Sequence, residues 1–348
     1  MDRCQSCTAV TVILVAAVAS CVPRVEADAP GRTPAPMALT DYRPYIKGGP
    51  SAAAWFGRRT ALILEGERPD ARDAKVMAAI CAMLDGLFDA YDRVTGRRPE
   101  LTDPFQGRIR VEVSPQVGGG LAYHGRLGYA VNDRLFQGLY DRVKAGGKTL
   151  DHVFFYETNR NYWMPDMASI DYATHDGPDS YGWWTVGFNN VMAVVLAREV
   201  PGVEDMTYYG QGSKQFAAGM EANLDEYLAH PDKYGWDNAW CVKMLPWKAN
   251  TSVNDLMTGL VLRLQREHGG LEFVSRLYRE IPRQPPPRDR SDYLAARDNF
   301  YAAASLAAGK DLGDFFTKGL RWRLSKATHD RVLKELRARR TAPRRRGK

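Results

Sequence analysis

The sequence predicts an α+β protein in which a strand-rich part precedes a mainly helical part. Two observations lead to this prediction: alternating, strand-like patterns lie in the first third of the chain, and apolar residues at helical spacing dominate the rest. The 348 residues are 45% hydrophobic and 26% charged, which excludes a disordered or polytopic membrane protein and allows a large core. The order of the elements favours segregated layers over an alternating β-α-β sheet.

Four features define the strand-rich part. Residues 59–66 have the pattern of a short strand that ends in a turn, and residues 108–113 alternate strictly between polar and apolar, as a half-exposed strand does. Between them, residues 71–92 have apolar side chains at helical spacing. The three glycines at 118–120 follow the second strand, and glycine beside a strand lets another backbone approach closely.

The remainder of the chain is predicted to be mostly helical. A polar loop is expected at about 165–181, and the proline-rich segment 282–290 is expected to be a rigid surface loop. Helical patterns occupy residues 133–144, 150–163, 183–199, 212–229, 252–267, 270–280, 292–308, 311–317 and 325–340.

The first thirty residues have the pattern of an export signal. The apolar stretch 8–19 is shorter than the roughly 20 residues that a membrane-spanning helix needs. Cys21 follows small residues, as the lipidated cysteine of a bacterial lipoprotein does, while Ala27 ends a small-x-small pattern typical of ordinary secretion. A retained transmembrane helix is the third alternative. We therefore expect an exported periplasmic or cell-surface protein that reaches a membrane only through a lipid anchor on Cys21.

The cysteines and the charge set further limits. Cys4 and Cys7 leave with the signal, and Cys21 is either lipidated or lost. The remaining Cys81 and Cys241 form either a disulfide or two buried thiols. The net charge of +7 is misleading, because residues 331–348 alone carry +8 and leave −1 for residues 1–330. We interpret the basic end as a solvated tail and expect no nucleic-acid partner.

These boundaries predict five segments. They are an export signal over 1–27, a linker over 28–45, a strand-rich subdomain over 46–165, a helical subdomain over 166–330 and a basic tail over 331–348.

The segment 152–163 carries the functional argument. Its run Val153–Tyr156 is apolar on all sides, which indicates a buried helix. Glu157 and Arg160 are three residues apart and can pair on one helix face. Polar side chains on a buried helix are costly unless each has a partner, so this helix is expected to lie at a polar site or in a paired network.

This segment resembles the active-site helix of the gluzincin metallopeptidases, in particular the enhancin-like and mucin-degrading branch, which reads His-Glu-x-Gly-His-Asn. In that family the two histidines bind zinc and the glutamate activates the zinc-bound water. Tyr156 stands at the first ligand, Glu157 at the general base, Arg160 at the second ligand and Asn161 at the following asparagine. Val186 stands where the family has its third ligand, a glutamate.

The resemblance covers about residues 60–330 and implies a gluzincin or thermolysin-like fold. Residues 108–122 resemble the substrate-binding edge strand, and residues 257–316 resemble the terminal helical subdomain. The zinc ligands, however, are all replaced. Valine has no donor atom and a protonated arginine repels Zn²⁺, so no metal and no other cofactor are expected. A rebuilt site from the scattered histidines His124, His152 and His175 is the alternative.

The remaining polar pocket supplies the candidate site residues. Glu157 is the candidate general base, with Asp171 or Asp176 (or Asp179) as a second carboxylate. The ligand-binding candidates are Tyr156, Arg160, Asn161, Trp184, His175 and Tyr123. Aromatic rings mixed with carboxylates suit carbohydrate, and they equally suit a buried aromatic core. The loop aspartates lack the ligand ladder of a Ca²⁺ loop.

Three functions follow from these residues. The first is an exported cell-envelope protein whose former active-site cleft binds a polysaccharide, a peptide or a protein partner. The second is a metal-independent glycan hydrolase or lyase in which Glu157 works with a loop aspartate. The third is a zinc peptidase with atypical ligands.

Overall fold

A computed structural model describes residues 36–39, 51–172, 183–289 and 291–341. The predicted export signal with Cys21 lies outside the described residues. The unit Thr33–Lys348 contains every element described below.

Among the described residues, a six-stranded sheet has the order β1-β2-β3-β4-β6-β5. Its strands are β1 (Met37–Leu39), β2 (Ala52–Phe56), β3 (Thr60–Glu65), β4 (Ile109–Ser114), β5 (Gly120–Ala122) and β6 (Tyr129–Asn132). The central strands β3, β4 and β6 are parallel, and β5 lies at the edge as an antiparallel partner of β6. At the other edge, β1 pairs with β2, so residues 37–39 belong to the sheet rather than to the predicted linker.

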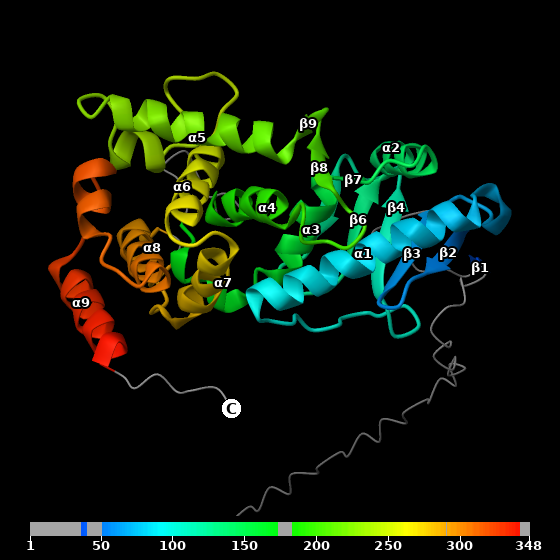
Figure 1. The fold of residues 1–348 in the computed structure, drawn as a ribbon, viewed down its shortest axis with the longest axis horizontal. Coiled ribbons are helices and arrows are strands. Elements are labelled where there is room, and N and C mark those ends of the chain that lie inside the picture. Colours follow the sequence, from blue (N-terminus) through cyan, green and yellow to red (C-terminus); the bar gives the residue numbers. More distant parts are fainter. Residues whose placement is uncertain (1–35, 40–50, 173–182, 290, 342–348) are drawn as a thin grey trace, which may run out of the picture. The chain divides into compact units, whose positions relative to one another are not determined.

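The helix α1 (Ala74–Thr95) connects β3 to β4 (Figure 1). The Asp73 side chain caps its start by accepting from the backbone N–H of Lys75, and Gly96, with φ 66°, ends it. Because β3 and β4 are parallel, these elements form a β-α-β unit. The sequence analysis predicted separate strand and helix layers, but at β3-α1-β4 the strands and the helix alternate along the chain. The reason is that parallel strands need a crossover connection, and the connecting helix covers a face of the sheet.

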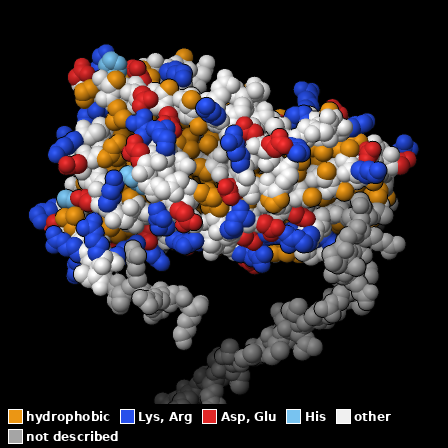
Figure 2. Space-filling model, viewed as in Figure 1, with side chains coloured by type: hydrophobic (Ala, Val, Ile, Leu, Met, Phe, Trp, Pro, Cys, Tyr) orange, Lys and Arg blue, Asp and Glu red, His pale blue; other side chains and the backbone are white. Residues whose placement is uncertain are grey.

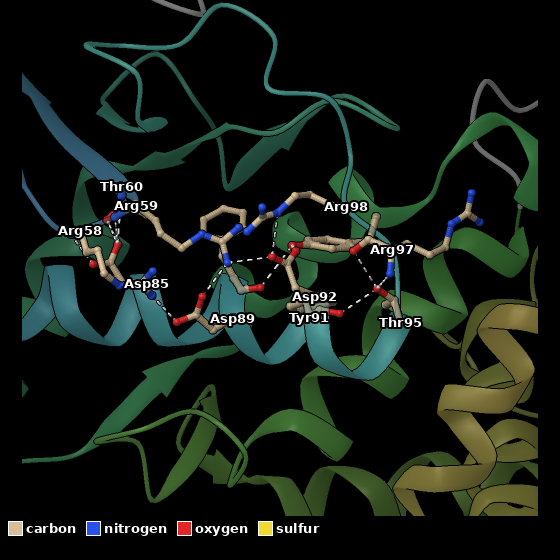
Figure 3. A network of polar contacts seen from close by, with 12 residues as sticks. Arg58, Arg59, Thr60, Asp85, Asp89, Tyr91, Asp92, Thr95, Arg97 and Arg98 are labelled. Carbon is tan, nitrogen blue, oxygen red and sulfur yellow. Dashed lines mark hydrogen bonds and ion pairs between the residues drawn. The ribbon is translucent and has the colours of Figure 1, made fainter. Parts of the chain in front are cut away.

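A buried aspartate attaches α1 to the sheet. The Asp85 carboxylate accepts from the backbone N–H groups of Arg58, Arg59 and Thr60 at 2.5, 3.0 and 2.9 Å, and Figure 3 shows it aimed at this turn. One helical turn later, Asp89 pairs with both arginines. These contacts hold α1 against the β2–β3 turn and so determine where its other end meets the site helix.

The following elements continue the chain. They are α2 (Asp133–Lys144), β7 (Thr149–Asp151), α3 (His152–Tyr162), α4 (Trp183–Leu196), β8 (Asp205–Tyr208), β9 (Gln211–Gly212), α5 (Ser213–Ala229), α6 (Val253–Glu267), α7 (Leu271–Glu280), α8 (Tyr293–Ala308) and α9 (Lys326–Thr341). Short 3-10 or π-helical segments occur at η1 (Pro69–Ala71), η2 (Pro165–Ile170), η3 (Trp236–Trp240), η4 (Ile281–Arg283) and η5 (Phe315–Gly319).

The predicted helical part also contains strands. β8 pairs in parallel with β7 and antiparallel with β9, which gives a second sheet of order β7-β8-β9. The sequence analysis missed these strands because they have two to four residues and because β7 and β8 pair over a long sequence separation. They matter for function, because the β8–β9 hairpin stands over the start of α3.

The predicted basic tail is partly structured. Residues 331–341 belong to α9, where Val332 and Leu336 are buried. Arg339 forms an ion pair with the buried Glu280 of α7 at 2.9 Å. The solvated-tail prediction is therefore wrong for these residues, because an amphipathic helix can bury apolar side chains among its charges. Residues 342–348 lie outside the described part.

The two remaining cysteines are free and buried. Burial raises the pKa of the Cys81 thiol, and it raises the pKa of Cys241 to about 12, so both behave as core side chains rather than as a disulfide.

None of the described helices is long and apolar enough to cross a membrane. Figure 2 shows basic and acidic side chains interspersed over the visible face.

Candidate functional site

The helix α3 is buried between α1, α4 and the sheet edge (Figure 1). Nine of its eleven residues are buried, as the sequence predicted. Two tyrosines bind it to α1: the Tyr91 hydroxyl donates to the carbonyl of Phe155 at 2.7 Å, and the Tyr162 hydroxyl donates to the Asp92 carboxylate. These reciprocal bonds determine how α3 presents its other faces to β5 and α4.

The side chains of Glu157, Asn159, Arg160 and Asn161 on α3 have partners inside the protein, whereas the buried Thr158 hydroxyl has no hydrogen-bond partner among the described residues. Asn159 donates to the side-chain oxygen of Asn189 on α4 at 2.7 Å and accepts from the Tyr278 hydroxyl of α7 at 2.6 Å. This network satisfies a fully buried amide and connects three helices. The requirement that such residues have partners, inferred from the sequence, is met at these four positions.

Asn161, predicted to bind ligand, instead holds the loop between β5 and β6. Its side chain accepts from the backbone N–H of Gly128 at 3.0 Å and donates to the carbonyls of Gly128 and Tyr123 at 3.0 and 3.4 Å. Asn161 is fully buried, so its predicted contact with ligand is wrong. The Asn161 side-chain amide thus supplies hydrogen bonds to buried backbone groups of this loop, and such groups need partners. Tyr123 lies on this loop and is 49% exposed.

Glu157 and Arg160 form a buried ion pair under the edge strand. Arg160 Nη1 lies 3.3 Å from Glu157 Oε2, and Glu157 is 3% exposed. A methyl group on Gly120 would lie 2.5 Å from Glu157 Cγ, so only glycine allows β5 to lie this close. Burial raises the pKa of Glu157 to about 7, against the opposing effects of Arg160 and of a hydrogen bond from the backbone of Ala122.

A cavity of 260 Å³ lies beside this pair, at the start of α3. We call it the Tyr156 cleft; its walls are Gly119, Leu135, Asp151, His152, Val153, Tyr156, Thr207, Tyr208 and Tyr209. The cleft is therefore built by the sheet edge, by α2 and α3, and by the β8–β9 hairpin. Tyr208 and Tyr209 are 38% and 88% exposed, and their rings meet edge to face at 4.7 Å.

His152 forms the floor of the Tyr156 cleft among aromatic rings. It packs against the rings of Tyr208, Phe216 and Tyr156 at 4.8, 5.3 and 5.5 Å. Its Nε2 lies 3.0 Å from Asn190 Oδ1, so the neutral ring donates to that amide. Burial lowers the pKa of His152 to about 4, and the ring is therefore neutral at physiological pH.

Tyr156 joins the cleft to the ion pair. Burial raises the pKa of the Tyr156 hydroxyl, and the charges of Glu157 and Arg160 are close enough to affect it. The α4 side chain beside this hydroxyl is Asn189, three residues beyond Val186. The structure thus brings together Tyr156, Glu157 and Arg160 of the predicted set, and α4 contributes an amide to them.

Other predicted residues serve the core. Both oxygens of Asp171 accept from Thr185 at 3.3 Å, and one of them also accepts from the indole of Trp163 at 3.2 Å. Trp184 is fully buried and stacks in an aromatic core, with the Phe300 ring 4.1 Å away. The predicted ligand contact of Trp184 is therefore wrong, and the role of Asp171 as a second carboxylate is not supported, because its oxygens are occupied. His175, Asp176 and Asp179 lie outside the described residues.

The predicted histidine alternative does not form a common site. His152 lies in the Tyr156 cleft, and His124 lines a separate cavity of 590 Å³ beside η2. Within the described part of the chain, no group of three or more histidine, cysteine, aspartate or glutamate side chains could hold a metal ion.

Sequence reasoning missed the hairpin wall of the cleft. The pair Tyr208-Tyr209 followed by Gly210 stands at a tight turn, where Tyr209 itself adopts φ 48°. Two adjacent tyrosines before a glycine were the available signal. Their contribution to the cleft depends on β7–β8 pairing, which no local pattern predicts.

Comparisons with known proteins show similarity of fold and nothing further. No family model matches the sequence, and no curated protein is similar to it. Two solved structures of a functionally unknown conserved protein from Bacillus anthracis str. Ames, one of them of a mutant, are similar in fold. Each has a TM-score of 0.50 and 12% sequence identity, and the match covers 82% of this chain and 52% of the other. The chain thus spans about half the length of these structures.

Proposed function

We propose that this protein is an exported cell-envelope protein that binds a polysaccharide in the Tyr156 cleft and no longer uses the zinc chemistry of the family it resembles. The observation that carries the proposal is the composition of the cleft: three tyrosine rings, a neutral histidine and the carboxylate of Asp151, which also pairs with Arg142, surround one small cavity. Aromatic rings stack on the apolar faces of sugars, and the polar groups bind sugar hydroxyls.

The exposure of the hairpin supports this proposal. Tyr209 is 88% exposed, although large aromatic side chains usually lie inside. At 260 Å³ the cleft is smaller than the roughly 300–1,000 Å³ typical of drug-sized ligands. Such a cleft fits one unit of a longer chain, whose neighbouring units would run over the exposed tyrosines.

The Glu157–Arg160 pair supports binding rather than hydrolysis. Paired carboxylates that cut glycosidic bonds need both groups free at the substrate, at separations of about 5–9.5 Å. Here Glu157 is buried against Arg160, and the oxygens of Asp171 are occupied by Trp163 and Thr185. The pair supplies a polar wall behind Tyr156.

One observation favours a second function, glycan hydrolysis with Glu157 as the acid or base. Burial raises the pKa of Glu157 to about 7, where a carboxyl group can exchange a proton at neutral pH. In this case a rearrangement would have to expose Glu157 to the Tyr156 cleft.

Affinity electrophoresis of the full chain against a panel of soluble neutral and acidic polysaccharides tests the proposal. We expect retardation by at least one of them, and a loss of about three- to tenfold in affinity for Tyr209→Ala, as expected for one stacked ring. Tyr123→Ala is the matched control, because Tyr123 is also exposed but does not line the cleft.

Three results would contradict the proposal. The first is equal weakening by Tyr123→Ala and Tyr209→Ala. The second is release of reducing sugar that disappears in Glu157→Gln, which would favour the hydrolase. The third is peptide hydrolysis that a chelator abolishes, with stoichiometric zinc in the purified protein, which would favour the atypical peptidase.

A further inference from the structure

A second cavity, of 670 Å³, lies in the helical part of the chain and shares no residue with the Tyr156 cleft. We call it the Trp236 pocket. It lies between the loop after α5, the first turn of α8 and the segment that joins η5 to α9. Its walls are Pro231, Asp232, Lys233, Tyr234, Gly235, Trp236, Asp237, Asn238, Tyr293, Leu294, Arg297, Arg321 and Arg323. Its volume is in the range of a small-molecule site.

Cations exceed acids in this pocket. Four of its side chains are basic and two, Asp232 and Asp237, are acidic. Both acids are exposed. Arg323 is also exposed, and no ion pair joins it to any of the residues that the structure describes. The pocket therefore presents a positive charge to a ligand.

Arg321 is held by backbone carbonyl groups, and no acidic side chain in the described part of the chain forms an ion pair with it. Its guanidinium donates to the backbone carbonyls of Tyr234, Gly319 and Tyr227 at 2.9, 3.2 and 3.0 Å and lies over the Tyr227 ring at 4.6 Å. Carbonyl oxygens satisfy the N–H donors but leave the full positive charge in place. A fixed, half-buried charge of this kind is already oriented before an anion arrives.

Arg297 is a buried cation that is only partly compensated. It is 5% exposed and stacks over the Trp236 ring at 5.3 Å, and its nearest acid is Asp298 at 3.5 Å. Among the described residues, neither Arg297 Nε nor the indole N–H of Trp236 has a hydrogen-bond partner. Both residues line the pocket, and a buried donor without a partner is costly to the folded protein.

An aromatic wall stands beside these donors. The rings of Trp236 and Tyr293 are stacked, with centroids 6.4 Å apart and planes within 26°, and Tyr234 closes the same cavity. A ligand with a flat or apolar ring can pack on this wall while its charged group lies toward the arginines.

From these contacts we infer that the Trp236 pocket binds an anionic sugar, with its ring on the Trp236–Tyr293 wall and its carboxylate or phosphate at the arginines. The two anion types share one chemistry, an oxyanion that accepts from planar guanidinium donors. This site is separate from the proposed polysaccharide cleft, so either inference can fail without the other.

Calorimetric titration of the full chain with four probes tests the inference. The probes are glucuronate, glucose 6-phosphate, neutral glucose and inorganic phosphate. We expect millimolar or tighter binding of an anionic sugar, at least about tenfold tighter than glucose or inorganic phosphate, because ring and charge both contribute. The ratio between glucuronate and glucose 6-phosphate identifies the oxyanion.

Variants at the rim locate the site without disturbing the core. Arg323→Ala is expected to weaken binding of the anionic sugar about tenfold, and Tyr293→Ala is expected to weaken it several-fold without changing the weak response to phosphate. Lys326→Ala, which removes an exposed charge outside the pocket, and Tyr209→Ala, in the other cleft, should change nothing. Undetectable binding of both anionic sugars, equal binding of glucose, or an unchanged affinity in Arg323→Ala would each overturn the inference.

Discussion

The protonation of Glu157 should make the stability of this protein depend on pH in a specific way. Its pKa is about 7 in the folded protein and about 4.5 in an unfolded chain, because burial under Gly120 outweighs the attraction of Arg160. The folded state therefore binds the proton more tightly. This contribution to stability is fully present below pH 4.5 and is lost as the pH rises through 7.

The magnitude follows from the difference between the two pKa values. A difference of roughly 2.5 units at 1.36 kcal/mol per unit corresponds to about 3 kcal/mol between pH 4.5 and pH 8. Glu157→Gln has a similar shape and cannot ionise, so it should mimic the protonated form. We expect the variant to match the wild type near pH 4.5 and to exceed its free energy of unfolding by about 3 kcal/mol near pH 8.

Urea denaturation of both proteins across this range measures the difference directly. The difference curve is essential, because other groups that titrate in the same range cancel in it. Glu272→Gln, at an exposed position of α7, serves as the control for the same substitution on the surface. A flat difference for Glu157→Gln, or a variant that becomes less stable as the pH rises, would refute the argument that burial dominates at Glu157.

Three further predictions concern the same helix and the strand beside it. Gly120→Ala places a methyl group 2.5 Å from Glu157 Cγ and should cost about 1–3 kcal/mol of stability, whereas Gly118→Ala meets nothing within 4 Å and should cost little, as thermal unfolding of the two would show. His152→Gln should make the protein less sensitive to acid. The free energy of unfolding of the wild type is expected to fall by up to about 3 kcal/mol between pH 6.5 and pH 4, because the histidine takes up a proton in the unfolded chain and not in the folded protein. Equal acid sensitivity in the variant would contradict this. Asn161→Ala should cost about 2–3 kcal/mol and increase amide exchange in the β5–β6 loop, since it leaves the N–H of Gly128 without its acceptor; unchanged exchange there would argue against a clamp.

Elements built on local periodicity were predictable from the sequence. The helix expected over 133–144 is observed at Asp133–Lys144, and that expected over 292–308 is observed at Tyr293–Ala308. Such helices depend on side chains three or four residues apart, and the sequence displays that spacing directly. The buried nature of α3 was predictable for the same reason, because its apolar run covers every face.

Contacts between segments that are distant in sequence could not be predicted from the sequence. β7 and β8 pair through Thr149 and Asp205, which no turn or periodicity connects. Trp184 shows the same limit for single side chains, because an aromatic residue near polar ones has the same sequence signature in a core and in a sugar-binding cleft. Only the packing of α4 against α8 showed that its ring lies in the core.

By itself, the sequence determined which side chains stand on α3 and that Glu157 and Arg160 can pair there, because both properties depend on a separation of three residues. The tertiary structure alone decided that β5 lies over this pair, that the β8–β9 hairpin completes the Tyr156 cleft, and that three arginines meet at Trp236. The physical reason is that burial, and with it the pKa of a carboxyl group or the cost of an unpartnered donor, comes from segments that are distant in sequence.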